Sequence, residues 1–134
     1  IGSMLRFRVG EGVEAIPSST PIRTALRTAR EASEGRRSGA LLLTNDRGVL
    51  EGIMTDGDLR RLLLDNPEAI DGPAAESMTK NPRTLQEDQP LREAERLVRT
   101  HRVDEIPIVD AEGRPVGLLD VQDLITLKVV RDPS

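Results

Sequence analysis

Thr55 and Asp58 stand three residues apart, where an apolar stretch gives way to acidic residues and glycine. This order predicts a strand, a tight turn and a helix whose N-terminus is capped by Thr55. The hydroxyl and the carboxylate can each accept a hydrogen bond from a free backbone N–H group, as in a capping box. The same spacing places both groups at the positive end of a helix, where they could contact the hydroxyl or phosphate groups of a ligand.

The spacing returns in the second half of the chain. Four positions repeat in order: Gly52 as Gly117, Thr55 as Asp120, Asp58 as Asp123 and Leu59 as Leu124. Matches at this many positions indicate an internal duplication. The halves differ where Asp120 replaces the hydroxyl of Thr55 with a second negative charge. We therefore expect one good ligand site and a poorer one, near Asp123, that repels phosphate but tolerates an uncharged ribose.

The elements that would position these residues follow the same order in both halves: extended, helix, strand, strand, helix. In the first half we predict extended segments over 5–9 and 13–16, a helix over 21–33, strands over 40–44 and 49–54, and a helix ending before Pro67. In the second half we predict an extended segment over 81–85, a helix opened by 88–90, strands over 106–109 and 116–119, and a helix over 124–130. The joint is expected at 71–73, and Leu59, Leu62 and Leu63 are expected to form a buried stripe.

Composition excludes several classes of function. The net charge of -4, with both signs interspersed, offers no basic surface for nucleic acid. No apolar run is long enough to span a bilayer and no leader is apparent, so we expect a cytoplasmic protein without membrane insertion. Cysteine is absent and His101 is the only histidine, which argues against a metal centre built from these residues. Phe7 is the only aromatic residue, so aliphatic side chains would have to hold a flat ligand.

Other interpretations of the polar residues remain open. Thr55 and Asp58 could form only a helix cap. Asp56 and Asp58 could suggest magnesium, but no glycine loop that cradles phosphate accompanies them. No nucleophile or oxyanion feature can be named, so we expect no catalytic residues. The basic pairs at 36–37 and 101–102 can stabilise helix C-termini through the dipole, or contact a phosphate.

The doubled pattern resembles a tandem pair of cystathionine-β-synthase domains, the CBS pair or Bateman module, over nearly the whole chain. The stretch Thr55-Asp56-Gly57-Asp58-Leu59-Arg60-Arg61 is similar to CBS pairs attached to arabinose 5-phosphate isomerases and to some sugar nucleotidyltransferases. The resemblance implies an α+β fold of two βαββα-like repeats, residues 4–70 and 74–131, related by a pseudo-twofold axis. It implies a regulatory module, with any catalytic domain lying outside this segment.

The resemblance also implies a ligand site in the cleft between the repeats, where Thr55 and Asp58 meet the phosphate and the ribose diol of an adenosine ligand. The expected ligand-binding residues are Ile53, Thr55, Asp58, Thr84, Arg37, Arg102, Asp120 and Asp123. AMP, ADP, ATP, S-adenosylmethionine or a sugar nucleotide would be a regulatory ligand rather than a required cofactor. Asp104 and Glu105 depart from the small, polar or basic residues that the family often places there.

A homodimer is the expected assembly, with exposed leucines of the helix at Asp58 in the contact. The alternative function is a dimerisation module without a ligand, belonging to a sugar-phosphate isomerase or a nucleotidyltransferase.

Overall fold

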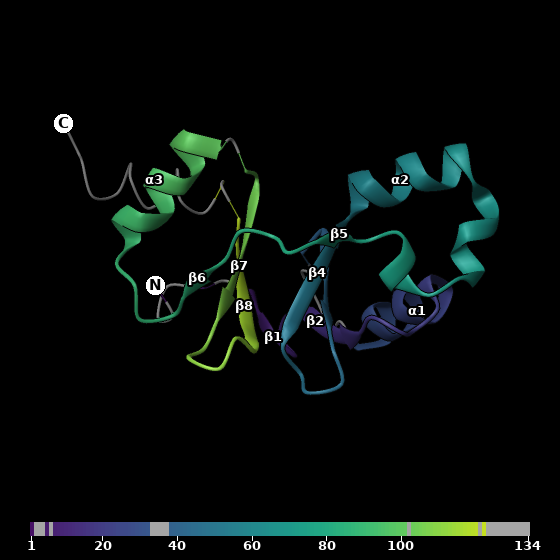
Figure 1. Ribbon diagram of the computed structural model, residues 1–134, viewed down its shortest axis with the longest axis horizontal. Coiled ribbons are helices and arrows are strands. Elements are labelled where there is room, and N and C mark those ends of the chain that lie inside the picture. The colour runs from purple at the N-terminus through teal and green to yellow at the C-terminus, as the bar shows by residue number, and fades with distance from the viewer. Residues whose placement is uncertain (2–4, 6, 33–37, 102, 121, 123–134) are drawn as a thin grey trace.

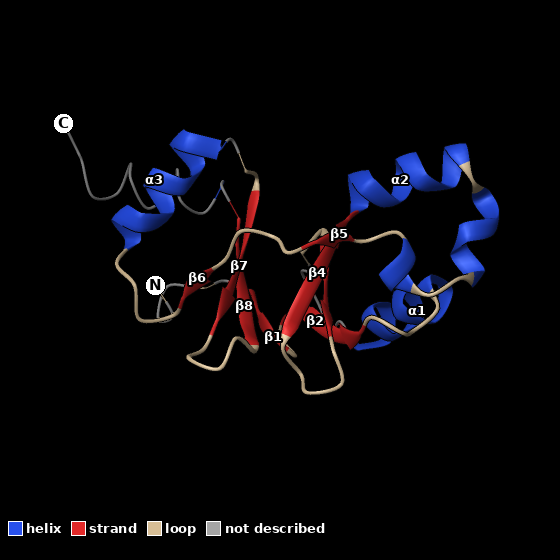
Figure 2. Cartoon of the chain, in the orientation of Figure 1, coloured by secondary structure: helices blue, strands red, loops and turns tan. Residues whose placement is uncertain are grey.

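The structure is a computed structural model that describes residues 1, 5, 7–32, 38–101, 103–120 and 122. Pairs of strands alternate with helical segments along the chain (Figures 1 and 2). In order they are β1 (Phe7–Val9), β2 (Gly12–Pro17), α1 (Ile22–Ala32), β3 (Ala40–Thr44), β4 (Leu50–Thr55), α2 (Asp56–Asp65), the 3₁₀ helices η2 (Pro67–Asp71) and η3 (Ala74–Glu76), β5 (Thr79–Lys80), β6 (Leu85–Gln86), α3 (Leu91–His101), β7 (Glu105–Val109) and β8 (Pro115–Asp120).

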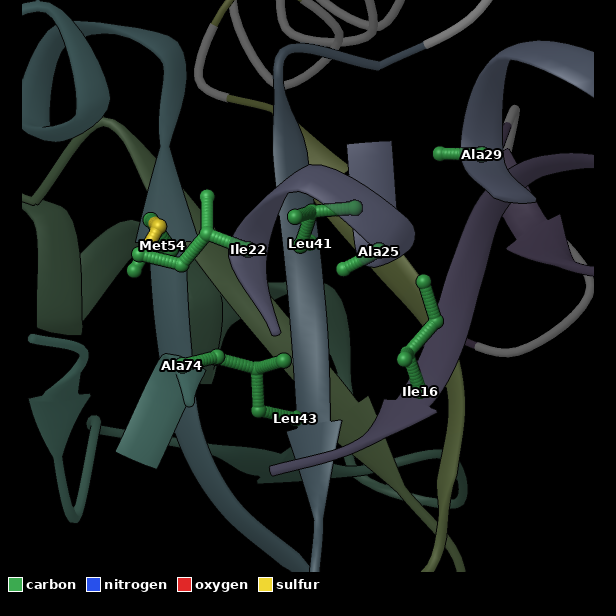
Figure 3. Close-up of a cluster of buried hydrophobic side chains, with 8 residues drawn as sticks. All are labelled: Ile16, Ile22, Ala25, Ala29, Leu41, Leu43, Met54 and Ala74. Atoms are coloured by element: carbon green, nitrogen blue, oxygen red, sulfur yellow. The ribbon is translucent and has the colours of Figure 1, made fainter. Parts of the chain in front are cut away.

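The first half folds around β3, whose five residues are all buried. β3 pairs in parallel with β2 and antiparallel with β4, so the predicted hairpin is confirmed. At its turn the Asn45 side chain accepts hydrogen bonds from the N–H groups of Arg47 and Val49, and Gly48 adopts a positive φ of 79°. The apolar face of α1 covers this sheet, and Figure 3 shows its side chains packed against those of the strands.

The second half repeats this plan. β7 pairs in parallel with β6 and antiparallel with β8, and the side chain of Asp110 accepts hydrogen bonds in the turn as Asn45 does. Both hairpins carry a register shift at the equivalent position, between Leu43 and Thr44 and between Ile108 and Val109. Two hairpins with the same register and the same irregularity confirm the duplicated α+β architecture.

β1 joins the two halves. It pairs with β2 in parallel and with β8 antiparallel, which gives an eight-stranded order β5-β4-β3-β2-β1-β8-β7-β6. A buried cluster crosses this seam, made of Phe7, Val13, Ala40, Leu42, Ile53 and Leu118. The two hairpins also meet, since the N–H group of Leu50 donates to the carbonyl oxygen of Gly113 at 3.0 Å. The halves therefore share a core, with helices at the outer ends of the molecule (Figure 1).

α2 differs from the sequence prediction. Its leucines were expected to form a buried stripe, but no residue of the helix is fully buried. Leu59 and Leu62 pack at the margin of the first-half core, and Leu63 is half-buried. The predicted stripe is only partly buried because α2 continues outward from the end of β4 and packs beside η2 instead of lying across the strands. Leu64 is 78% exposed.

The segment that links the halves extends beyond the predicted joint at 71–73. Asp71-Gly72-Pro73 stays tied to the first half, because the N–H group of Ile22 donates to the carbonyl oxygen of Gly72. β5 pairs with β4, whereas β6 pairs with β7, so the chain passes from one half to the other between Lys80 and Leu85. The predicted helix over 124–130 lies outside the described residues. In the part of the chain that the structure covers, no helix is both long enough and apolar enough to cross a membrane.

The equivalent glycines of β4 and β8 predict different costs of substitution. A Cβ atom at Gly117 would stand 2.5 Å from the carbonyl oxygen of Phe7, so the β1 backbone would have to move. A Cβ atom at Gly52 would meet the flexible side chain of Met78 instead. We expect Gly117→Ala to lower the free energy of unfolding by about 1–3 kcal/mol, and Gly52→Ala to lower it less. Urea denaturation followed by circular dichroism would measure both, and equal losses would contradict this account of the seam.

Candidate functional site

A cleft of about 660 Å³ opens where α2 begins. One wall comes from the end of β4 and the first turn of α2, and the facing wall comes from the start of β7. The link from β5 to β6 passes over the same end of the sheets (Figure 1). The lining residues are Gly39, Ile53, Thr55, Asp56, Gly57, Asp58, Arg61, Thr79, Asn81, Pro82, Arg83, Val103, Asp104 and Glu105. The cleft is thus built from both halves.

Thr55 and Asp58 form the capping box at the start of α2. The N–H group of Asp58 donates to Thr55 Oγ1 at 3.1 Å, and the N–H group of Thr55 donates to Asp58 Oδ2 at 3.3 Å. The other carboxylate oxygen of Asp58 accepts a hydrogen bond from Arg61 at 2.5 Å. The threonine hydroxyl keeps its own hydrogen to donate. A ligand could therefore engage Thr55 with the cap intact, and Asp58 by displacing the exposed Arg61 side chain.

The floor of the cleft combines apolar and polar groups. Ile53 is buried on β4, and Val103 is half-buried at the opposite side. The N–H group of Asp56 donates to the carbonyl oxygen of Gly39 at 2.8 Å, which extends the pairing of β3 with β4 up to the first residue of α2. The lining contains four carboxyl groups and two guanidinium groups, so acidic side chains outnumber basic ones. Such a site combines apolar contact area with hydrogen-bond acceptors at a helix N-terminus.

The pKa of the Glu105 carboxyl is shifted by its surroundings in the cleft. It is the first residue of β7 and pairs with Asp120 of β8 across the hairpin. Burial, followed by the negative charges of Asp120, Asp56, Asp104 and Asp58, raises the pKa of its carboxyl from 4.5 to about 7. Its Oε2 atom is buried and has no hydrogen-bond partner among the described residues. Glu105 therefore exchanges a proton near neutral pH inside the cleft.

The structure brings some of the sequence-predicted site residues together. Ile53, Thr55 and Asp58 line the cleft. Thr84 is exposed and lines a different, open groove beside the turn of the second hairpin. Asp120 lies opposite Glu105, and its Oδ1 atom accepts a hydrogen bond from the N–H group of Gln122 at 2.8 Å.

Three of the predicted residues, Arg37, Arg102 and Asp123, lie outside the described residues. The participation of every predicted residue in ligand binding stays a prediction.

Sequence reasoning missed the segment from Thr79 to Arg83 as part of the cleft. Pairing of β5 with β4 brings it there, and the N–H group of Asn81 donates to the carbonyl oxygen of Glu51. Asn81 adopts a φ of 51°, a left-handed conformation that asparagine tolerates better than most residues. The Asn81-Pro82 dipeptide was the available signal, because it marks a turn. Nothing in its local pattern indicates which distant strand the turn approaches.

The family model described as "CBS domain" matches the chain twice, over residues 10–65 and 74–129. Among curated proteins the chain is 28% identical to arabinose 5-phosphate isomerase KpsF of Escherichia coli over 92% of the chain and 38% of the isomerase. It is 30% identical to a probable arabinose 5-phosphate isomerase of Haemophilus influenzae over 90% of the chain and 36% of that protein. The chain thus spans little more than a third of these isomerases, and the matched part is their CBS part.

Solved structures of similar fold include several with adenosine ligands. CBSX2 in complex with AMP superposes with a TM-score of 0.73 at 21% identity, covering 97% of this chain and 96% of that one. The cytosolic domain of the Mg²⁺ channel MgtE in complex with ATP gives 0.72 at 25% identity, covering 90% and 46%. The CBS domain pair of MJ0100 in complex with 5'-methylthioadenosine and S-adenosyl-L-methionine gives 0.70 at 24% identity, covering 88% and 89%. These likenesses bear out the duplicated fold.

The raised pKa of Glu105 makes stability depend on pH. The folded protein holds this proton more tightly than the unfolded chain does. The protonated carboxyl therefore contributes fully to the free energy of unfolding below about pH 4.5, and this contribution is lost as pH rises through about 7. Over this range we expect the free energy of unfolding of the wild type to fall by about 1–2 kcal/mol, a figure reduced from the full shift because water partly screens the carboxyl. In Glu105→Gln this fall should be absent. Urea denaturation of both proteins between those pH values would measure it. Parallel stability profiles would contradict the expectation.

Proposed function

The chain belongs to the CBS domain family, and from this premise we propose that it is a regulatory module that binds an adenosine-type nucleotide, or a related sugar nucleotide. The observation that carries the proposal is the cleft between the halves, which collects Ile53, Thr55 and Asp58 on one wall. CBS domain pairs are regulatory modules, and the part of the isomerases that this chain matches is their CBS part. We therefore propose a regulatory role. The repeats are proposed as residues 4–70 and 74–131.

The chemistry of the cleft suits a nucleoside. The ionised carboxylate of Asp58 can accept two hydrogen bonds from the vicinal diol of a ribose, and such charge-assisted bonds are stronger than neutral ones. The first turn of α2 and the hydroxyl of Thr55 provide donors for a phosphate. Ile53 and Val103 supply aliphatic surface for the base. Asp58 would exchange its bond to Arg61 for bonds to the diol, which would leave this guanidinium free to face a phosphate.

Ligands recorded for other proteins of this fold support the proposal. CBSX2 was solved with AMP, the MgtE domain with ATP, and MJ0100 with 5'-methylthioadenosine and S-adenosyl-L-methionine. These ligands share an adenosine moiety and differ in charge. They support an adenosine-binding role for the cleft and leave the substituent on the ribose as the variable feature.

Regulation would follow from the position of the cleft between the halves. A ligand in contact with both the start of α2 and the start of β7 favours whichever arrangement of the halves fits it best. We propose that this preference controls an attached or partner protein, of the kind represented by the longer isomerases. The ligand changes that protein only as far as it binds the two arrangements with different affinity.

Calorimetric titration with AMP, ATP and S-adenosylmethionine tests the proposal. We expect one of them to bind and to stabilise the fold by about 2.7 kcal/mol at a hundredfold excess over its Kd. We expect Asp58→Asn to weaken that binding by about tenfold or more, because the amide keeps an acceptor for the cap but loses the charge. Asp65→Asn is the matched control, at the far end of the same helix. Equal effects of the two substitutions, or no binding by any of the three ligands, would refute the proposed site.

We further propose that the chain forms a homodimer through α2. Leu64 is 78% exposed and Leu63 is only half-buried, so apolar surface remains available on this helix. Dimerisation without a ligand is the alternative function, and it predicts that nucleotides change neither stability nor size.

Sedimentation velocity would test the homodimer. We expect the wild type to sediment as a dimer and Leu64→Glu to sediment as a monomer, because a charge would be buried in the contact. Arg60→Glu, also on the exposed surface of α2, would control for a change of charge alone. A dimer that survives Leu64→Glu would exclude this contact.

A further inference from the structure

The two halves differ most sharply at one cross-strand pair. In the first half Ala40 lies opposite Thr55, so a methyl group faces a hydroxyl-bearing side chain. In the second half the equivalent pair is Glu105 opposite Asp120, so two carboxyl groups face each other. Like charges opposite one another destabilise a sheet. The duplication therefore carries an unfavourable pair at the edge of the cleft, where the first half is neutral.

Among the described residues, the charged groups around Glu105 are mainly carboxylates. From β8 it faces Asp120, from the start of α2 it faces Asp56 and Asp58, and Asp104 precedes it in the chain. The two guanidinium groups in the lining belong to Arg61 and Arg83. Arg61 already pairs with Asp58, and neither guanidinium contacts the buried Oε2 atom of Glu105 within the described part of the chain.

We propose that Glu105 selects the charge of the ligand: its neutral form admits a phosphate group to the cleft, and its ionised form repels one. This inference rests on the proposed nucleotide site and assigns a further residue of that site. The neutral carboxyl can donate a hydrogen bond to a phosphate oxygen, whereas the carboxylate can only accept. An uncharged nucleoside meets no comparable repulsion. The cleft would then take AMP more readily at mildly acidic pH and show little such preference for adenosine.

The physical basis is the linkage between binding and protonation. Because the carboxyl titrates near neutrality, both of its forms are populated under ordinary conditions. A bound phosphate raises the affinity of Glu105 for a proton, and by reciprocity the proton raises the affinity for phosphate. If the bound phosphate raises the pKa of the Glu105 carboxyl by one, the affinity for the phosphate changes by about tenfold between the two forms of the carboxyl. Binding of AMP near neutral pH would therefore be accompanied by proton uptake.

Calorimetric titration of the chain with AMP and with adenosine, at about pH 6 and about pH 8, tests the inference. For the wild type we expect AMP to bind about tenfold more weakly at the higher pH, whereas adenosine changes by less than about twofold. The phosphate of AMP itself titrates near pH 6, so the informative quantity is the difference between wild type and Glu105→Gln. We expect this variant to lose most of the pH dependence, together with the proton uptake measured in buffers of different ionisation enthalpy.

Two further variants complete the experiment. Glu105→Ala installs the residue found at the equivalent position of the first half, and it should behave as Glu105→Gln does. Glu112→Gln removes a carboxylate from the exposed hairpin turn outside the cleft and should keep the wild-type pH dependence. The same pH dependence in wild type, Glu105→Gln and Glu105→Ala would overturn the selector role while leaving the nucleotide site intact. Failure of both ligands to bind at either pH would overturn the proposed site and the selector together.

Discussion

Burial of apolar side chains across the seam between the halves is the interaction on which the rest of the structure depends. Phe7 of β1 and Leu118 of β8 pack with Leu42 and Ile53 of the first half, so a third buried cluster joins the separate cores of the two halves. A single short repeat would bury too little surface to be stable, which is why duplication and a shared core occur together. The cleft is a by-product of this packing, because it opens at one end of the seam. Ligand chemistry can therefore vary at its rim without removing the contacts that hold the halves together.

The start of α2 serves stability and chemistry with the same atoms. The capping box satisfies free backbone donors of the helix, and it also fixes the hydroxyl of Thr55 and the carboxylate of Asp58 at the edge of the cleft. A residue that must cap a helix keeps one orientation, which is what a binding site needs. At the corresponding position of the second half, the carboxylate of Asp120 accepts a hydrogen bond from the N–H group of Gln122, and Asp120 faces Glu105. The same hairpin pairing thus carries a neutral pair in the first half and two carboxyl groups in the second.

Much of the fold follows from local patterns that can be read in the sequence. The unbroken apolar run 40–44 has no polar face to expose, so it forms a buried central strand, and the turn residues at Asn45 and Asp110 form the hairpins that their side chains favour. The leucines of α2 were mispredicted because helical spacing reports an apolar face but not what covers it. Both β1 and β8 were predicted as strands, but their pairing was not. The two strands lie more than a hundred residues apart in the chain, and no local pattern reports such a contact.

Within the candidate site, the sequence indicated the wall formed by Ile53, Thr55 and Asp58, because helix capping leaves a local signature. It also marked Glu105 as unusual for the family. The unusual proton affinity of Glu105 could not be predicted, since it arises from burial and from carboxylates on three separate segments. Asn81 and Arg83 were missed for the same reason, because only the pairing of β5 with β4 carries them into the lining.

The place of β1 links the beginning of the chain mechanically to the second half. This strand comes first in the chain, yet it lies beside β8, and Leu5 packs with the core of the second half. Any domain joined ahead of Leu5 would be anchored to the half that is synthesised last. A pull or a rotation at that junction would be transmitted by β1 to β8 as directly as to β2, so the distant repeat would respond to it without the rest of the first half as intermediary. One end of the chain is in this way mechanically coupled to both repeats at once.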